Sequence, residues 1–190
     1  MKVLQVCAGR AQEVTIGARR LLTAIGKRAL VGEPVAVGPL GLAGDEQADL
    51  TVHGGLSKAL YAYPSEHHAF WRTVRAQARV ALWDDEPPAP GLFGENLLLQ
   101  GLTEDQLWIG DRLVLPHCVL AVSEPRQPCF KFNAAMGFAQ ASKLMVSSGF
   151  CGAYLAVIEP GHVQAGDPIR LAPGPREVGL RELFRARARA

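Results

Sequence analysis

Short apolar runs separated by frequent turn residues dominate the pattern of hydrophobic and polar positions along the chain. The run at residues 3–8 predicts a first strand, and the alternation at residues 34–42 predicts a second. Residues 119–123 and 153–158 form further runs of strand length. Because short runs bounded by glycine, proline and aspartate are typical of strands, the pattern predicts a mainly β protein with a few helices.

Two segments, residues 107–115 and 163–171, share a pattern in which Gly-Asp lies between apolar residues. Gly-Asp favours a tight turn that leads into a strand. We interpret the two segments as equivalent corners of a β-barrel, and not as a sequence repeat.

Helical periodicity is limited to three segments. Apolar residues recur at helical spacing after Pro64, which suits the first turn of a helix. A second helix is predicted over residues 137–146 and ends at Gly149, and a short amphipathic helix is predicted from Leu180. The prolines of residues 84–91 exclude a helix or a central strand and predict a surface loop.

The length and composition are those of one globular domain. The 190 residues are 48% hydrophobic and 20% charged, which excludes disordered and fibrous proteins. The net charge of +2 and the scattered basic residues predict no nucleic-acid partner. No stretch approaches the roughly 20 apolar residues of a membrane span, and the N-terminus lacks a signal-peptide pattern. We therefore expect a cytoplasmic protein with no membrane partner.

Three patches contain residue types that are poor for packing, and the first lies at residues 44–58. Paired glycines beside a histidine let backbone N–H groups approach a ligand closely, and an anion or a metal-bound oxygen suits them. A turn with a hydrogen-bonded histidine is the alternative interpretation. The candidate residues of this patch are Asp45, His53, Gly54, Gly55 and Lys58.

The second patch contains Glu95 and Asn96 between apolar residues. In a strand, two successive side chains point to opposite faces, so one would face a cavity and the other solvent. A polar turn is the alternative interpretation.

The third patch, residues 123–131, directly follows an apolar run and contains Cys129 between Arg126 and Lys131. Nearby cations favour the thiolate, which is the form of cysteine that binds metals or attacks electrophiles. The other three cysteines lie in apolar contexts, and no CxxC pair is present, so we expect all four to be reduced. Cys129 is therefore the candidate reactive cysteine.

The order of these patches resembles the MOSC domain family, and most closely its stand-alone YiiM-like branch. The resemblance covers about residues 1–172 and implies a β-barrel domain there. The amphipathic pattern after Leu180 predicts a partly helical tail at residues 173–190. The matching segments are GDEQADLTVHGGLSKALYAYPSEHHAFW, LFGENL, IGDRL, EPRQPCFKF and GAYLAVIEPGHVQAGD.

The resemblance implies a molybdenum cofactor (molybdopterin) with a cysteine as protein ligand, which maps to Cys129. It also implies reduction of N-hydroxylated compounds, such as hydroxylaminopurine-type base analogues, to amines. An external electron donor protein and a small N-hydroxylated substrate are the partners it implies.

The remaining candidate residues follow from this cofactor. Anionic oxygens favour cationic and backbone donors, and a proton donor must lie close to the departing oxygen. His53, Asp45 and Glu95 are the alternative proton donors. The candidate cofactor-binding residues are Lys27, Gly54, Gly55, Lys58, Asn96, Arg126 and Lys131.

Two other functions stay open at this point. A reactive Cys129 also suits a sulfur carrier that forms a persulfide, and the fold suits a cofactor-binding barrel without catalysis. A zinc site that uses Cys129 and His53 is less well supported, because the sequence shows no clear set of four ligands.

Overall fold

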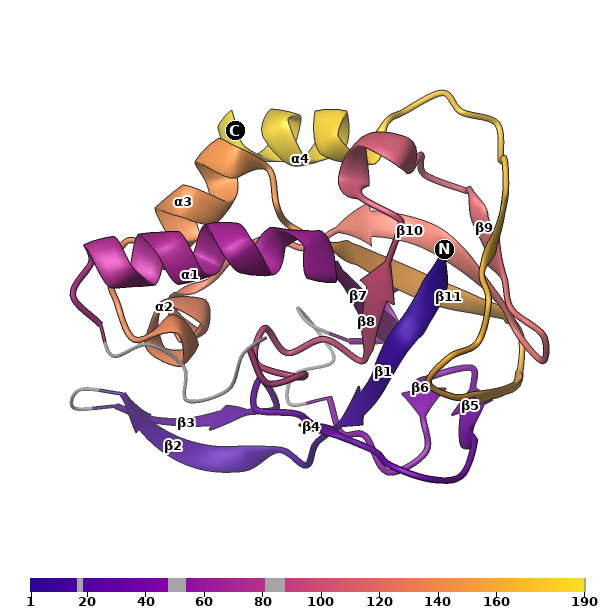
Figure 1. Cartoon of the computed structure of the whole chain (residues 1–190), viewed down its shortest axis with the longest axis horizontal. Helices are drawn as coiled ribbons and strands as arrows, with labels where there is room; N and C mark the ends of the chain where they lie inside the picture. The colour runs from indigo at the N-terminus through magenta and orange to yellow at the C-terminus, as the bar shows by residue number, and fades with distance from the viewer. Residues whose placement is uncertain (17–18, 48–53, 81–87, 190) are drawn as a thin grey trace.

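An eight-stranded mixed sheet forms the largest part of the molecule (Figure 1). The computed structural model describes residues 1–16, 19–47, 54–80 and 88–189. Neighbouring strands are antiparallel except for the parallel pair β7 and β8. In spatial order the strands are β13 (Arg170–Ala172), β9 (Arg112–Val114), β10 (Val119–Pro125), β11 (Ala153–Glu159), β7 (Leu60–Pro64), β8 (Leu97–Gln100), β1 (Lys2–Ala8) and β4 (Arg28–Ala29).

Two smaller sheets complete the β structure. One pairs β12 (Gly161–Val163) with β5 (Val35–Gly38) and β6 (Gly41–Leu42). The other is the hairpin of β2 (Gln12–Ile16) and β3 (Arg19–Thr23). Figure 1 shows this hairpin below α2, and the Lys131 ammonium on α2 donates a hydrogen bond of 2.7 Å to the Leu22 carbonyl on β3.

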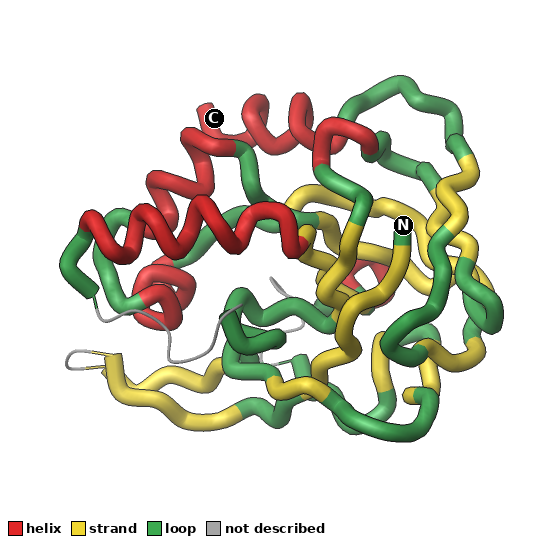
Figure 2. Tube along the Cα trace, in the orientation of Figure 1, coloured by secondary structure: helices red, strands yellow, loops and turns green. Residues whose placement is uncertain are grey.

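The helices gather at one side of the sheet (Figure 2). The described residues contain four α-helices and three short 3-10 helices. Their bounds are α1 His68–Gln77, α2 Phe130–Met136, α3 Ala141–Ser148, α4 Leu180–Arg189, η1 Leu56–Lys58, η2 Ser65–His67 and η3 Glu104–Gln106.

The prediction of one helix over residues 137–146 is wrong at its start. Gly137 has a left-handed backbone (φ 78°) and ends α2, and α3 begins only at Ala141. A left-handed glycine terminates a helix because residues with a Cβ adopt this conformation at a cost. The predicted end at Gly149 is confirmed, since it caps α3 with φ 76°.

The predicted Gly-Asp turns are confirmed, and the runs at residues 3–8, 119–123 and 153–158 form β1, β10 and β11. The single strand predicted over residues 34–42 is wrong, because a turn divides this run into the hairpin of β5 and β6. Gly110 and Gly166 have φ values of 89° and 94°. The aspartate after each glycine accepts a backbone N–H from three residues earlier, at 3.1 Å for Asp111 and 3.0 Å for Asp167. β9 and β13 follow these two turns.

The sheet-dominated fold is confirmed, but a closed barrel is not. Within the described ranges the strand order is open, with β13 and β4 at its edges. The two ends approach each other through an isolated bridge between Lys2 and Pro168. The Val3 N–H also donates to the Asp167 carbonyl at 2.9 Å.

Two hydrophobic clusters form the core. The first lies on the sheet and is mostly aliphatic. The second is largely aromatic and joins the sheet to the helices, with fully buried Tyr63, Trp71, Phe93, Phe132 and Phe184. Because Phe184 comes from α4, the C-terminal helix packs into this cluster.

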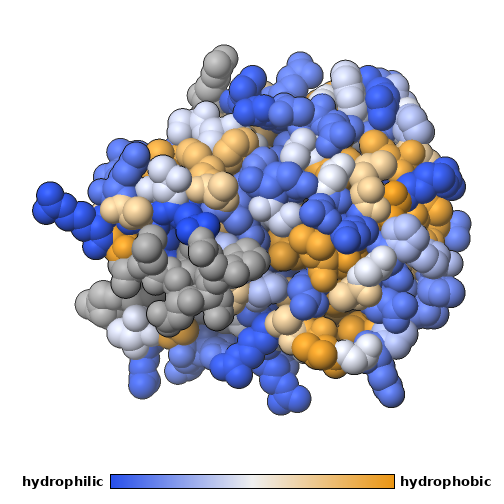
Figure 3. Space-filling model, viewed as in Figure 1, coloured by the Kyte–Doolittle hydropathy of each residue, from blue (hydrophilic) through white to orange (hydrophobic). Residues whose placement is uncertain are grey.

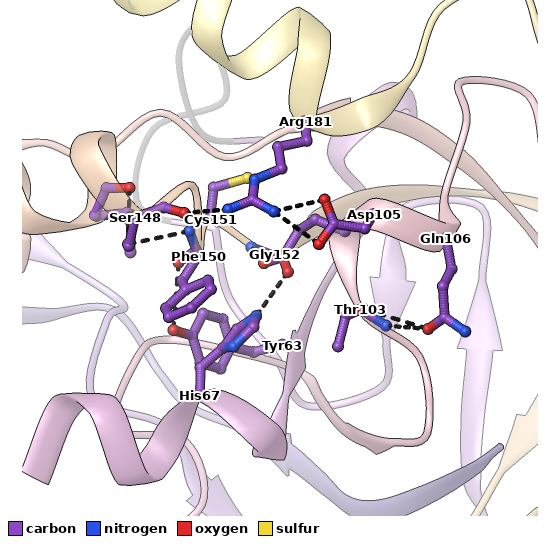
Figure 4. Close-up of polar contacts among 12 residues, drawn as sticks. Tyr63, His67, Thr103, Asp105, Gln106, Ser148, Phe150, Cys151, Gly152 and Arg181 are labelled. Atoms are coloured by element: carbon purple, nitrogen blue, oxygen red, sulfur yellow. Dashed lines mark hydrogen bonds and ion pairs between the residues drawn. The ribbon is translucent and has the colours of Figure 1, made fainter.

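A polar network fixes the first turn of α4 beside η3 and the end of α3 (Figure 4). Arg181 forms an ion pair of 2.6 Å with Asp105 and donates a hydrogen bond to the Ser148 carbonyl. Beneath it, buried His67 contacts a Glu104 oxygen at 2.6 Å, and the other Glu104 oxygen accepts the Gly152 N–H. The network joins four segments that are distant in sequence.

Apolar residues lie in small patches among polar residues on the face shown in Figure 3. Among the described residues, we find no helix with the length and apolar character that crossing a membrane requires.

Candidate functional site

One cavity brings together seven of the residues that the sequence singled out. It opens between the end of β3, the connection from β10 to α2, and strands β7 and β11, and its empty volume is about 650 Å³. The seven residues are Lys27, Asp45, Lys58, Asn96, Arg126, Cys129 and Lys131.

Cys129 lies at the N-terminal boundary of α2, in extended conformation and half-buried. Its carbonyl accepts hydrogen bonds from the Phe132 N–H at 2.9 Å and the Ser142 hydroxyl at 3.1 Å. The backbone of α2 and α3 therefore fixes the position of this thiol on the cavity wall.

The other three cysteines are buried, as their apolar contexts predict, and none of the four forms a disulfide. Burial raises the pKa of Cys118 to about 11 and also raises the pKa of Cys7 and Cys151. These three side chains therefore stay as thiols at neutral pH, and Cys129 is the one cysteine that lines the cavity.

Arg126 is a buried cation with only 6% of its surface exposed. Its Nη1 donates a hydrogen bond of 2.7 Å to the Phe93 carbonyl, and the guanidinium lies 4.9 Å from the Tyr61 ring centre and 5.1 Å from that of Phe132. No carboxylate of the described chain forms an ion pair with it. Because a buried charge without a counter-charge is costly, this position favours an anionic ligand.

Lys58 and Lys131 add positive charge to the same cavity. The Lys58 ammonium lies 3.8 Å from a Glu124 oxygen and 5.7 Å above the Tyr154 ring. The Lys131 ammonium contacts a backbone carbonyl. Both ammonium groups therefore place positive charge on the wall of this cavity.

Asp45 anchors the opposite wall. It accepts hydrogen bonds from the Lys27 ammonium, from the Gly9 N–H at 2.9 Å and from the Asn96 amide at 2.8 Å. The Asn96 side chain also accepts the Tyr61 N–H at 3.0 Å. Asp45 and Asn96 therefore connect the end of β1 with strand β7 through side-chain hydrogen bonds.

Glu95 and Asn96 point in different directions, as the pattern predicts, but neither faces solvent. Asn96 lines the cavity, whereas Glu95 does not. The Glu95 carboxylate is fully buried and accepts the N–H groups of Gly91 at 2.7 Å and Phe93 at 3.0 Å. Burial raises its pKa to about 7. Glu95 therefore fixes the backbone of the loop at residues 91–93 through hydrogen bonds.

The glycines of the first patch lie beside the cavity and do not line it. The Gly55 N–H donates to the Gln47 side chain at 2.9 Å, and Gln47 itself lines the cavity. His53 lies outside the described residues. Among those described, no group of three or more His, Cys, Asp or Glu side chains is placed to hold a metal ion.

The sequence did not single out three further lining residues, Gln47, Tyr61 and Tyr154. Gln47 lies two residues after Asp45 in the first patch, and this position could have marked it as a candidate site residue. The tyrosines lie in the apolar strands β7 and β11, where an aromatic residue is normally part of the core. Their proximity to Arg126 appears only when the strands are assembled.

Comparison with known proteins agrees with this arrangement, because the MOSC domain matches residues 49–170. The chain belongs to the MOSC domain family. It is 38% identical over 161 residues to the protein YiiM of Escherichia coli, with 84% of this chain and 68% of that protein covered. The crystal structure of YiiM from Geobacillus stearothermophilus matches with a TM-score of 0.74 and 30% identity, covering 96% of this chain and 81% of that one.

These two matches show that the chain is a YiiM-like MOSC protein. A third relative, named "Reductase", comes from Gibberella moniliformis and is 34% identical over 179 residues. This chain covers only 29% of that fungal protein, so the MOSC part is a minor share of its length.

Proposed function

We propose that the chain binds a molybdenum cofactor in this cavity through Cys129 and uses it to reduce N-hydroxylated compounds to amines. The observation that carries the proposal is the buried Arg126, which has no carboxylate partner in the described chain and lines the same cavity as the accessible Cys129. Membership of the MOSC family and the name "Reductase" of the fungal relative support a molybdenum-dependent reductase.

The lining residues fit such a cofactor. Four cationic side chains, on Lys27, Lys58, Arg126 and Lys131, face two carboxylates, on Asp45 and Glu46. Asp45 is already bonded to Lys27, so the positive charge at the Cys129 side is available to a phosphate. A soft thiolate suits molybdenum that is already bound by sulfur. The donor set therefore matches a group that is anionic and rich in sulfur.

When bound, the cofactor supplies two-electron chemistry at the oxygen of R–NH–OH. The balanced reaction takes two electrons and two protons and yields R–NH2 and water. Cys129 would hold the metal, and Arg126, Lys58 and Lys131 would hold the phosphate and pterin oxygens. An external electron donor protein would supply the electrons.

Two of the three residues that the sequence suggested as proton donors have contacts that suit this role poorly. Asp45 already accepts three hydrogen bonds from donors, and Glu95 does not line the cavity. We therefore propose His53 as the proton donor, since imidazole exchanges protons near neutral pH.

Replacing Cys129 by serine tests the proposal, because a hydroxyl is nearly isosteric with a thiol but is a poor ligand for a soft metal. We expect Cys129→Ser to fold normally and to lose bound molybdenum and the reduction of hydroxylaminopurine. Molybdenum is measured by elemental analysis of protein made in a host that synthesises the cofactor. The buried Cys118→Ala is the control and should keep both properties. Wild-type turnover in Cys129→Ser would contradict the proposal.

The same accessible thiol supports a second candidate, a sulfur carrier. Purified protein that contains no molybdenum but carries a trapped persulfide on Cys129 would favour the sulfur-carrier function. Bound cofactor without any reduction of hydroxylamines would instead favour a non-catalytic cofactor-binding protein.

A further inference from the structure

A second cavity lies next to the first and differs from it in character. Its walls come from the β2–β3 hairpin, residues 25–27, the loop at 89–92 and α2, and its empty volume is about 750 Å³. The lining is mainly apolar. Its apolar side chains belong to Val14, Ile25, Ala89, Pro90, Leu92 and Ala135.

The two cavities share walls. Thr23, Ile25 and Lys27 line both of them. On α2, Lys131 lines the first cavity and Ala135 lines the second. Residues four apart are neighbours on one helix face. The second cavity therefore continues from the first along the same face of α2.

The charges divide between the two cavities. The cations that surround Cys129 belong to the first cavity, and the Lys27 ammonium is bonded there to Asp45. Lys27 therefore presents mainly its methylene stem to the second cavity. Arg10 and Gln12 are exposed at the outer part of the second cavity. Such a lining favours an uncharged, mostly apolar ligand with a few polar edge atoms.

The wall between residues 25–27 and the 89–92 loop is closely packed. The Lys27 N–H donates to the Gly91 carbonyl at 3.3 Å. A Cβ at Gly91 would lie 2.3 Å from the Lys27 carbonyl oxygen. Glu95 holds the same loop through the Gly91 and Phe93 N–H groups. This part of the cavity wall is therefore formed before any ligand binds.

We infer that the second cavity binds the uncharged ring system of the substrate, with its apolar faces against the apolar walls, while the N-hydroxyl group reaches into the first cavity. Val14, Leu92 and Ala135 limit the size of that ring system. The inference rests on the proposed function for the role of the ligand, but the binding itself is measurable without turnover.

The test fills the second cavity from α2. Ala135→Leu adds bulk to its wall, whereas Ala134→Leu adds the same bulk at an exposed position of the same helix that lines neither cavity. Binding of adenine and of 6-hydroxylaminopurine is measured by titration calorimetry on the cofactor-loaded chain. We expect at least ten-fold weaker binding in Ala135→Leu, unchanged binding in Ala134→Leu, and equal molybdenum content in both. Val14→Phe fills the cavity from the opposite wall and should weaken binding similarly.

The outcomes separate this inference from the proposed function. Equal binding in Ala135→Leu, Val14→Phe and the wild type, or no purine binding to the wild type, overturns the inference. Tighter binding of the purine ribonucleotide monophosphate than of the free base also overturns it. Purine binding that Ala135→Leu weakens, with no reduction of hydroxylaminopurine by the wild type, keeps the binding site and rejects the reductase function.

Discussion

At the residue scale, the four cysteines differ in how deeply their side chains are buried. Cys7 and Cys151 have no exposed surface, and Cys118 is 4% exposed, whereas Cys129 is half-buried on the wall of a cationic cavity. Desolvation disfavours the thiolate at the three buried positions. The reactive chemistry of the chain is therefore concentrated at one sulfur, and the charges around it decide what it binds.

Neutral substitutions of Arg126 and Lys131 test those charges. If both cations hold an anionic cofactor, Arg126→Gln and Lys131→Gln should each weaken its retention by about ten- to a hundred-fold, the worth of a charge-assisted hydrogen bond. Molybdopterin content after dialysis measures this. Lys143→Gln, at an exposed lysine of α3, is the matched control. Wild-type molybdopterin content in both variants would show that the two cations do not hold the cofactor. If alkylation of the Cys129 thiol were slower in these variants while the cofactor content stayed the same, the cations would act only by favouring the thiolate.

The pKa of Glu95 predicts a pH dependence of stability. Its value of about 7 lies above the ordinary 4.5, so the folded state binds a proton that the unfolded state releases between these values. The protonated form therefore stabilises the fold at low pH, and this contribution is lost as pH rises through 7. Between pH 5 and pH 8 the loss is roughly 2.5 kcal/mol.

Urea unfolding of the wild type and Glu95→Gln across this range measures the effect, since other groups titrate equally in both. We expect the difference in unfolding free energy between the two proteins to change with pH. A constant difference would show that Glu95 keeps one protonation state throughout.

Glycines set the boundaries and contacts of segments at the element scale. Gly137 ends α2 before α3 begins at Ala141, which leaves Cys129, Lys131 and Ala135 on or beside a short helix next to both cavities. Gly91 lets the 89–92 loop lie directly on residues 25–27. Both glycines therefore shape the site without lining the first cavity.

Gly91→Ala and Gly166→Ala separate backbone strain from steric contact. Their φ values are similar, at 90° and 94°, but a Cβ at Gly166 meets nothing within 4 Å. We expect Gly166→Ala to cost about 1–2 kcal/mol of unfolding free energy from strain alone. Gly91→Ala should cost about 1–3 kcal/mol more, because its Cβ overlaps a backbone oxygen. Equal losses in the two variants, measured by urea unfolding, would show that the 25–27 segment moves without cost.

The C-terminal helix is part of the core at the scale of the whole molecule. α4 contacts α3, β10 and η3, and Leu180 and Phe184 have no exposed surface. The Arg181 network of Figure 4 fixes its first turn. Stability of the sheet and of the helical side should therefore depend on residues well after β13.

Phe184→Ala measures this dependence. Removing a fully buried phenylalanine should lower the unfolding free energy by about 3–5 kcal/mol, while Arg185→Ala, at an exposed position of the same helix, should change it by less than about 0.5 kcal/mol. Chemical denaturation followed by circular dichroism gives both values. Similar small losses in both variants would mean that α4 unfolds independently of the core.

The sequence by itself determined the features that depend on local pattern. Short apolar runs predicted β1, β10 and β11, Gly-Asp predicted the turns before β9 and β13, and Gly149 predicted the end of α3. These features follow from local backbone preferences. The charges close to Cys129 in sequence singled out this cysteine, and the resemblance of the three patches to the family indicated the other residues that meet in the cavity.

Only the tertiary structure decided which environment each polar side chain enters and which residues it contacts there. Glu95 and Asn96 are adjacent in sequence, yet Glu95 accepts the Gly91 N–H in the loop, whereas Asn96 donates to Asp45 and lines the cavity. Tyr61 and Tyr154 became part of the site because β7 and β11 pair beside Arg126. The second cavity likewise depends on a hairpin, a loop and a helix that are brought together by packing, since long-range contacts leave no mark on local periodicity.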